Sequence, residues 1–190
     1  MLHTCKKLLF LLLVFGSLQA KTQVALQKTI PASQGPLFTC PQWVYLGYSG
    51  FKFVYFNGTD TLNLYNLNYS LFKSIVIPGN WGSYPGISFI SEGLFDTDTS
   101  HVEYMITTTG GPVSFAIYKD NGTLVFGETN AYAPSVVGNL PGFSSPIFNS
   151  DSGTFMIVTQ VNSSSRWVAT QFYKLGGKLP CLPGCLGGAP

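Results

Sequence analysis

The feature that most constrains the fold is a tyrosine at the end of a strand-like run that is followed, six residues later, by a leucine. This spacing occurs three times, in the pairs Tyr65 and Leu71, Tyr118 and Leu124, and Tyr173 and Leu179. Tyr65 and Tyr118 lie 53 residues apart, and Tyr118 and Tyr173 lie 55 residues apart. A period of this size predicts repeated supersecondary units that share one core.

Each repeat contains four apolar segments, several of which alternate apolar and polar residues as half-buried strands do. The segments are 43–45, 51–56, 61–65 and 71–77, then 87–90, 102–107, 114–118 and 123–126, then 146–148, 155–160, 167–173 and 178–179. Turn dipeptides such as Asn57-Gly58 and Asn121-Gly122 separate them, and these residues favour tight hairpins. The pattern predicts an all-β protein built from three four-stranded antiparallel meanders.

How three such units close is left open by the sequence. A propeller usually has about four to eight blades, so three units would form an incomplete propeller. A pseudo-threefold prism or trefoil-like arrangement and a β-sandwich are the alternatives. We expect one all-β domain over residues 41–180, preceded by an arm or linker at 21–40 and followed by a Cys-, Gly- and Pro-containing tail at 181–190.

Residues 1–20 have the pattern of a secretory signal peptide, with Lys6 and Lys7 before an apolar run and small residues up to Ala20. A retained N-terminal anchor is the alternative. Without this segment the chain has no predicted membrane span. Basic and acidic residues are then equal in number, because two of the ten Lys and Arg residues are removed and all eight Asp and Glu residues remain. A net charge of zero argues against nucleic acid as a partner, since such proteins carry a basic surface.

Three cysteines remain after the signal peptide, namely Cys40, Cys181 and Cys185. In an oxidising compartment one disulfide is expected. Cys40 paired with either later cysteine would join the two ends of the repeat array, and Cys181 paired with Cys185 would close a small loop. A zinc site is not expected, because the mature chain has one histidine and no fourth soft ligand.

The loops 95–100 and 148–153 share a pattern of Phe, Asp or Asn, Ser or Thr, Asp, and Ser or Thr. Such side chains bond to nearby backbone groups, so we interpret both loops as capped turns. The alternative is a calcium site in which Asp96 and Asp98 supply oxygen ligands. Calcium takes about six to eight oxygens, and these two side chains alone supply fewer. No cofactor is expected.

No catalytic residues can be assigned from the sequence. A hydrolase of the Ser, His and acid type would need His101 as its base, and no serine stands in a Gly-x-Ser-x-Gly turn. A glycosidase would need two carboxylates across a cleft, and the spacing of Glu92, Asp96, Asp98 and Glu103 selects no pair. We interpret these acids as a solvated edge and His101 as a loop residue.

Aromatic residues are the best candidates for ligand binding, because several of them lie in Gly- or Pro-rich loops where the core does not need them. The set is Trp43, Trp81, Tyr84, Tyr132 and Trp167. Trp81 and Tyr84, which share the loop 78–85, are the strongest pair. The alternative is that such a ring folds back and covers one end of the core.

Segments 64–75, 87–98, 102–104 and 117–124, together with the closing segment 172–181, resemble the β-repeat region of exported Bacteroidota proteins that are type IX secretion substrates. The resemblance covers roughly residues 60–185 and includes no catalytic residue. It implies a secreted or cell-surface location, with a periplasmic one as the alternative, and the C-terminal sorting domain of that family does not follow before Pro190. We therefore predict a non-catalytic module for binding, adhesion or structural support, with a glycan or a cell-surface protein as partner. An accessory domain of a secreted hydrolase that acts on glycans or proteins is the alternative.

Overall fold

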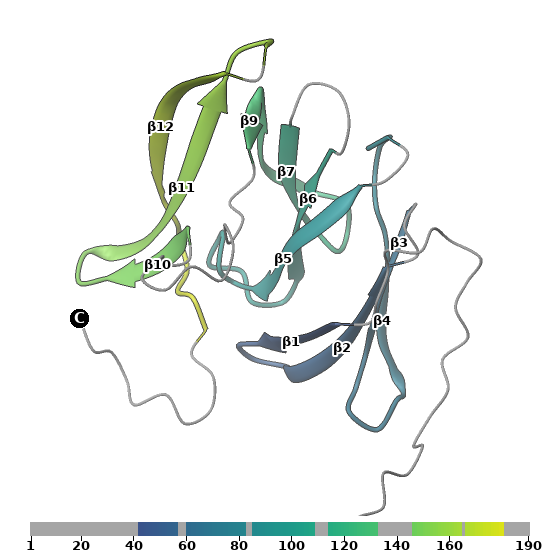
Figure 1. Ribbon diagram of the computed structural model, residues 1–190. Helices are drawn as coiled ribbons and strands as arrows, with labels where there is room; N and C mark the ends of the chain where they lie inside the picture. Colours follow the sequence, from purple (N-terminus) through teal and green to yellow (C-terminus); the bar gives the residue numbers. More distant parts are fainter. Residues whose placement is uncertain are drawn as a thin grey trace, which may run out of the picture. The chain divides into compact units, whose positions relative to one another are not determined.

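The computed structural model describes residues 42–56, 60–82, 85–108, 114–132, 146–164 and 166–180 (Figure 1). The chain divides into two units, Met1–Pro31 and Ala32–Pro190, and the described residues all belong to the second. They form three antiparallel sheets and contain no helix, which confirms the predicted all-β class. No helix long and apolar enough to span a bilayer is found among these residues.

The first sheet is a meander of four strands in chain order. Its strands are β1 (Gln42–Leu46), β2 (Gly50–Phe56), β3 (Thr61–Tyr65) and β4 (Leu71–Val76). The predicted alternation is present in β3, where Leu62 and Leu64 are buried and their neighbours are half-buried. One face of this sheet therefore packs inward while the other contacts solvent.

The second sheet repeats this meander. Its strands are β5 (Gly86–Glu92), β6 (Val102–Thr107), β7 (Ser114–Lys119) and β8 (Leu124–Thr129). Five consecutive residues of β6 are buried, so both faces of this sheet are covered at that strand. The predicted Asn121-Gly122 turn joins β7 to β8, with Gly122 at a φ of 84°, which costs little for a residue without a Cβ atom.

The repeated tyrosine and leucine are cross-strand partners in the first two sheets. Tyr65 on β3 lies opposite Leu71 on β4, and Tyr118 on β7 lies opposite Leu124 on β8. In both hairpins the register shifts by one residue beside the tyrosine, which is the signature of a β-bulge. The repeat therefore marks the hairpin between the third and fourth strands of a unit.

The third sheet departs from this plan. It contains β10 (Ile147–Ser150), β11 (Gly153–Val161) and β12 (Trp167–Lys174), and its fourth strand is β9 (Ala131–Tyr132). The prediction of a fourth strand at 178–179 was wrong, because the chain after β12 leaves the sheet. β9 instead pairs with β11 at Thr159 and Gln160, on the edge that β10 occupies farther along.

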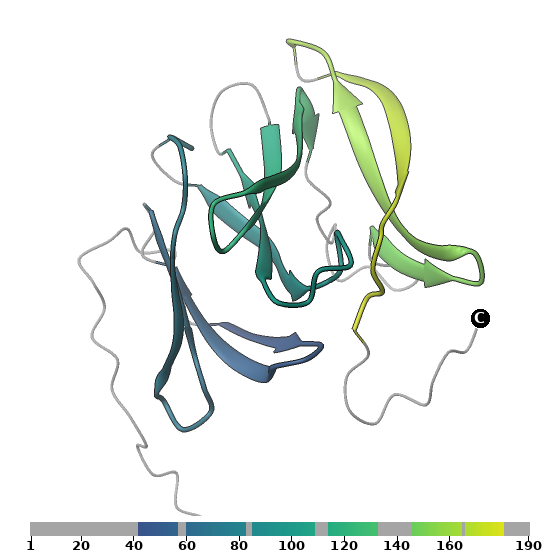
Figure 2. The same ribbon diagram turned by 180° about the vertical axis from the view of Figure 1, so that it is seen from behind.

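The core residues form two clusters on opposite faces of the second sheet, which lies between the other two sheets in both views (Figures 1 and 2). Tyr104 on β6 packs with Leu62 and Leu64 of the first sheet. The next residue, Met105, packs with Met156 and Val158 of the third sheet. Consecutive sheets therefore stack face on face, as in a propeller or a sandwich. A prism or trefoil would have one core shared by all three units, and the described residues form two core clusters instead.

Candidate functional site

The loop between β5 and β6, residues 93–101, is organised by the buried carboxylate of Glu103. This carboxylate accepts hydrogen bonds from the backbone N–H groups of Leu94 (2.8 Å), Phe95 (3.1 Å) and Asp96 (2.9 Å), and from the hydroxyl of Ser91 (3.1 Å). Four donors satisfy a charge that would otherwise be costly to bury. Glu103 therefore fixes the loop and is not free to act as an acid or a base.

Glu92 has a similar role toward the turn between β1 and β2. Its carboxylate accepts hydrogen bonds from the N–H groups of Tyr48 (3.1 Å) and Ser49 (2.8 Å) and from the hydroxyl of Ser49 (2.5 Å). Lys52, which is also buried, donates to the carbonyl oxygen of Ser49. The turn of the first sheet is thereby attached to the end of β5 in the second.

The segment that follows β12 lies against the same loop, and two glycines make this approach possible. The N–H of Gly177 donates to the carbonyl of Leu94 at 3.0 Å. A Cβ atom on Gly177 would lie 1.6 Å from the carbonyl oxygen of Gly93, and one on Gly176 would lie 3.3 Å from the Cα atom of Asp96. Only glycine allows the backbones to approach this closely at residue 177.

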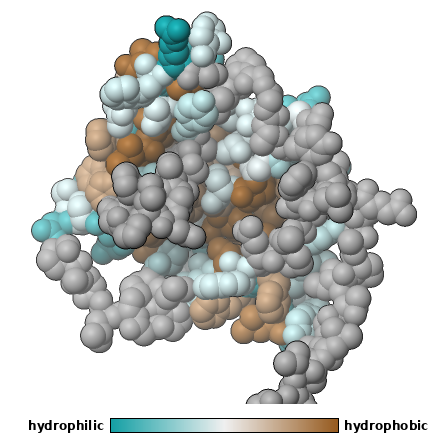
Figure 3. All heavy atoms as spheres, viewed as in Figure 1, coloured by the Kyte–Doolittle hydropathy of each residue, from teal (hydrophilic) through white to brown (hydrophobic). Residues whose placement is uncertain are grey.

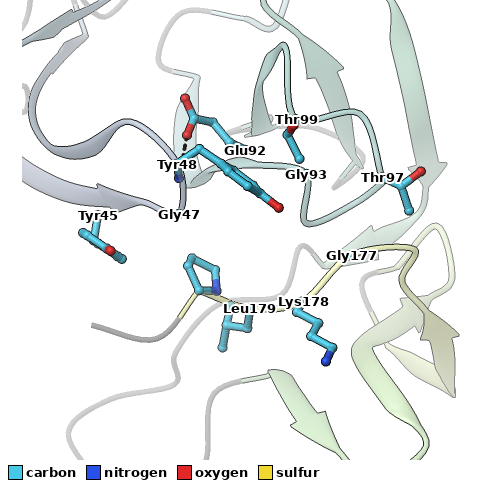
Figure 4. Close-up of a pocket in the computed structure, with 11 residues that line it drawn as sticks. Tyr45, Gly47, Tyr48, Glu92, Gly93, Thr97, Thr99, Gly177, Lys178 and Leu179 are labelled. Atoms are coloured by element: carbon cyan, nitrogen blue, oxygen red, sulfur yellow. Dashed lines mark hydrogen bonds between the residues drawn. The ribbon is translucent and has the colours of Figure 1, made fainter. Parts of the chain in front are cut away.

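A pocket of about 440 Å³ opens where these three segments meet (Figure 4). The side chains that give it chemical character are those of Tyr45, Tyr48, Glu92, Thr97, Thr99 and Lys178. Tyr48, at the border of the pocket, is 71% exposed. The pocket therefore offers a phenol ring and hydroxyl groups, with the exposed Lys178 at its border, while its carboxylate already accepts hydrogen bonds from backbone and hydroxyl donors.

Beside this pocket, two carboxylates of the loop converge on one lysine. The ammonium group of Lys119 lies 2.8 Å from the carboxylate of Asp96 and 2.9 Å from that of Asp98. The calcium alternative for Asp96 and Asp98 stays a prediction, but the Lys119 ammonium holds the place between them that a cation would take. Within the described ranges, no group of three or more His, Cys, Asp or Glu side chains could hold a metal ion.

His101 is paired with Asp120 in the turn between β7 and β8. Its Nδ1 lies 2.6 Å from Oδ1 of Asp120, and Lys73 of β4 donates to the other oxygen. The described groups that face its Nε2 are the amide of Asn121 at 3.4 Å and the carboxylate of Asp98 at 4.0 Å. Neither is a hydroxyl or thiol that a histidine base would activate, so no described residue stands as the nucleophile of a hydrolytic triad beside this pair.

The charges of this cluster shift the pKa values of its acids. Burial alone would raise the pKa of Asp120, but hydrogen bonds from Lys73 and His101 outweigh burial and hold it below the ordinary value. Burial would likewise raise the pKa of Asp96, but hydrogen bonds from Lys119 and from the backbone N–H of Asp98 together outweigh it and lower the pKa. Burial raises the pKa of Glu103, and its four donors limit the rise.

The predicted aromatic candidates separate into two groups. Trp43, Tyr132 and Trp167 are exposed and lie on strands. Trp81 is half-buried against the first core cluster, with its indole N–H on the carbonyl of Pro78 at 2.8 Å and its ring edge-on to Tyr118. Trp81 therefore covers one end of the core, which is the alternative to ligand binding given above. Tyr84, its predicted partner in ligand binding, lies outside the described residues.

The pocket residue that the sequence analysis missed is Tyr48. It lies in the turn Gly47-Tyr48-Ser49 between β1 and β2, where packing of the strands does not require an aromatic ring. That placement is the signal that could have identified it. Cys40, Cys181 and Cys185, with the disulfide predicted among them, lie outside the described residues, as do the signal segment 1–20 and the tail 181–190.

Comparisons of this chain with models of protein families, with curated proteins and with solved structures found no match.

Proposed function

We propose that this chain is an exported, non-catalytic β-repeat module that binds a glycan at the pocket bordered by Tyr48. The observation that carries the proposal is an exposed tyrosine, Tyr48, in a pocket that Thr97 and Thr99 also line (Figure 4). Aromatic rings stack on the apolar faces of sugars, and hydroxyl groups exchange hydrogen bonds with sugar hydroxyls.

The charged groups around the pocket support binding over catalysis. Glu92 and Glu103 are each satisfied by backbone and hydroxyl donors, and a glycosidase would need two carboxylates free to reach a sugar. Lys178 is exposed at the pocket, where its ammonium group would favour a sugar that carries a carboxylate or sulfate. The hydrolase-accessory alternative stays a prediction that no described contact favours.

Export is supported by the sequence of residues 1–20 and by the resemblance to exported Bacteroidota repeat proteins. Sequencing the N-terminus of the protein recovered outside the cytoplasm tests this part of the proposal. We expect a mature chain that begins close to Lys21, and recovery of intact residues 1–20 inside the cytoplasm would contradict export.

Glycan binding is tested with the purified chain on an array of neutral, uronic-acid and sulfated glycans. Tyr48→Ala should abolish retention, while Tyr132→Ala, a change at an exposed tyrosine on β9, should leave retention unchanged. Lys178→Gln should weaken binding of the anionic glycans more than that of the neutral ones. Retention that survives Tyr48→Ala, or a wild-type chain that binds no glycan, would contradict the proposal.

A further inference from the structure

The repeat leaves one strand position open at the outer edge of β12. In the first two sheets the third strand, which carries the repeated tyrosine near its end, pairs with a fourth strand. β12 carries the third tyrosine, Tyr173, and among the described strands it pairs with β11 alone. Both ribbon views show β12 at the border of its sheet (Figures 1 and 2).

The residues that would form the fourth strand are used elsewhere. After β12 the chain turns to the second sheet, where Gly177 donates to Leu94. Leu179, the counterpart of Leu71 and Leu124, exchanges hydrogen bonds with the side chain of Asn149 on β10. The next residue is Pro180, which has no N–H to donate to a strand ladder. Among the described residues, no strand therefore occupies the outer edge of β12, and its hydrogen-bonding groups remain available.

Three of the exposed side chains along this edge are large and apolar. Trp167, Val168 and Phe172 are 70%, 64% and 66% exposed, and Figure 3 shows hydrophobic residues gathered over β11 and β12. Phe172 lies opposite Ile157 of β11, so the apolar surface continues across the outer face of the sheet. An eight-residue edge strand with such a surface is a template for another strand.

The charges at the two ends of β12 decide what kind of strand fits. Exposed Arg166 and Lys174 flank the apolar stretch, and neither forms an ion pair within the described ranges. In a second copy paired through β12, the register that sets Val168 opposite Phe172 also sets Arg166 opposite Lys174. Like charges directly opposite are destabilising, so self-pairing in this register is disfavoured.

The parts of this chain outside the described residues contain no acidic residue that could pair with Arg166 or Lys174. All Asp and Glu residues lie within the described ranges, and no acid is present in segments 133–145 or 181–190. We propose that the edge of β12 accepts an extended segment of a different protein chain, with apolar residues at alternate positions and an acidic residue at each end. The partner would lie beside β12 as β4 lies beside β3 and β8 beside β7.

A synthetic peptide of about nine residues, alternating valine and threonine between an Asp and a Glu, tests this proposal. The wild-type chain should bind it, and hydrogen exchange at alternate amides of β12 should slow. Val168→Asp should weaken binding at least about tenfold by repelling the acidic end and removing an apolar contact. Val76→Asp, at a valine on β4 that is 70% exposed, is the matched control and should bind like wild type.

Three results would overturn the proposal. They are no binding of the peptide, equal weakening by Val76→Asp and Val168→Asp, or equal binding of a peptide with lysine at both ends. A doubled mass in sedimentation that Val168→Asp reverses would instead identify a second copy as the occupant. If Val168→Asp fails to fold, hydrogen exchange on the wild-type chain decides by itself. Slower exchange at alternate amides of β12 with the peptide bound supports the proposal, and unchanged exchange overturns it.

Discussion

The hydroxyl groups of Tyr104 and Tyr173 stand in opposite situations. The hydroxyl of Tyr104 is buried beside the first core cluster without a hydrogen-bond partner among the described residues. Burial, with Tyr118 and Asp120 nearby, holds its pKa far above the ordinary value. The hydroxyl of Tyr173 contacts Glu128 at 2.8 Å and Gln171 at 2.6 Å. Its pKa rises to about 12, through burial and the nearby Glu128 carboxylate.

We expect Tyr104→Phe to raise the free energy of unfolding by about 1 kcal/mol, because it removes a polar group that is buried without a partner. Tyr173→Phe should lower it by about 1 kcal/mol, because it breaks a hydrogen bond to a carboxylate. Chemical denaturation of both variants measures the difference. A loss of stability in Tyr104→Phe equal to that in Tyr173→Phe would show that the Tyr104 hydroxyl has a partner.

At the scale of elements, the strands and most turns could be predicted because their signals are local. The alternation in β3 and the Asn-Gly turn before β8 are read from neighbouring residues. β9 could not be predicted, because a strand of two residues has no period and exists through its pairing with β11. The departure at 178–179 depends on Gly177 meeting a loop of another sheet, which local sequence does not encode.

The segment after β12 provides the test at this scale. Gly177→Ala should lower the free energy of unfolding by about 1–3 kcal/mol, because the new methyl group would overlap the carbonyl of Gly93. Gly127→Ala is the control, since its new Cβ atom would have no described neighbour closer than 3.6 Å. Equal stabilities of the two variants in urea denaturation would mean that residues 175–180 do not lie against the loop.

At the scale of the whole described fold, an ion cluster joins the first two sheets. Lys73 of β4 reaches Asp120 in the turn after β7, and His101 holds the same carboxylate. The pKa of Asp120 is lowered from its ordinary value of 3.8. Stability from this carboxylate is therefore present above pH 3.8 and is lost as the pH falls through the lowered pKa. The pKa of Glu103 is raised, so this carboxyl lowers the free energy of unfolding as the pH rises above its ordinary pKa of 4.5.

The unfolding free energy should therefore fall as the pH drops below about 4. Asp120→Asn should lose about 1–3 kcal/mol at neutral pH by breaking charged hydrogen bonds, and its stability should change less than that of wild type at acidic pH. Thermal unfolding from pH 7 to pH 2.5 measures both effects. Asp151→Asn, at an exposed turn residue, should follow the wild-type profile, and an Asp120→Asn curve parallel to wild type would contradict the assignment.

The sequence by itself determined the all-β class, the three repeated units and the hairpin that joins the third and fourth strands of the first two. These features follow from alternation and turn residues, which act over a few neighbouring positions. Only the tertiary structure decided how the sheets stack, why Glu92 and Glu103 hold loops, and where Tyr48 borders a pocket. Those outcomes depend on contacts between residues far apart in the chain, such as Glu92 with Ser49 and Gly177 with Leu94. The pair Tyr173 and Leu179 shows this limit of the sequence. Its spacing matches that of the other two pairs, but Leu179 forms hydrogen bonds with Asn149 and does not begin a strand.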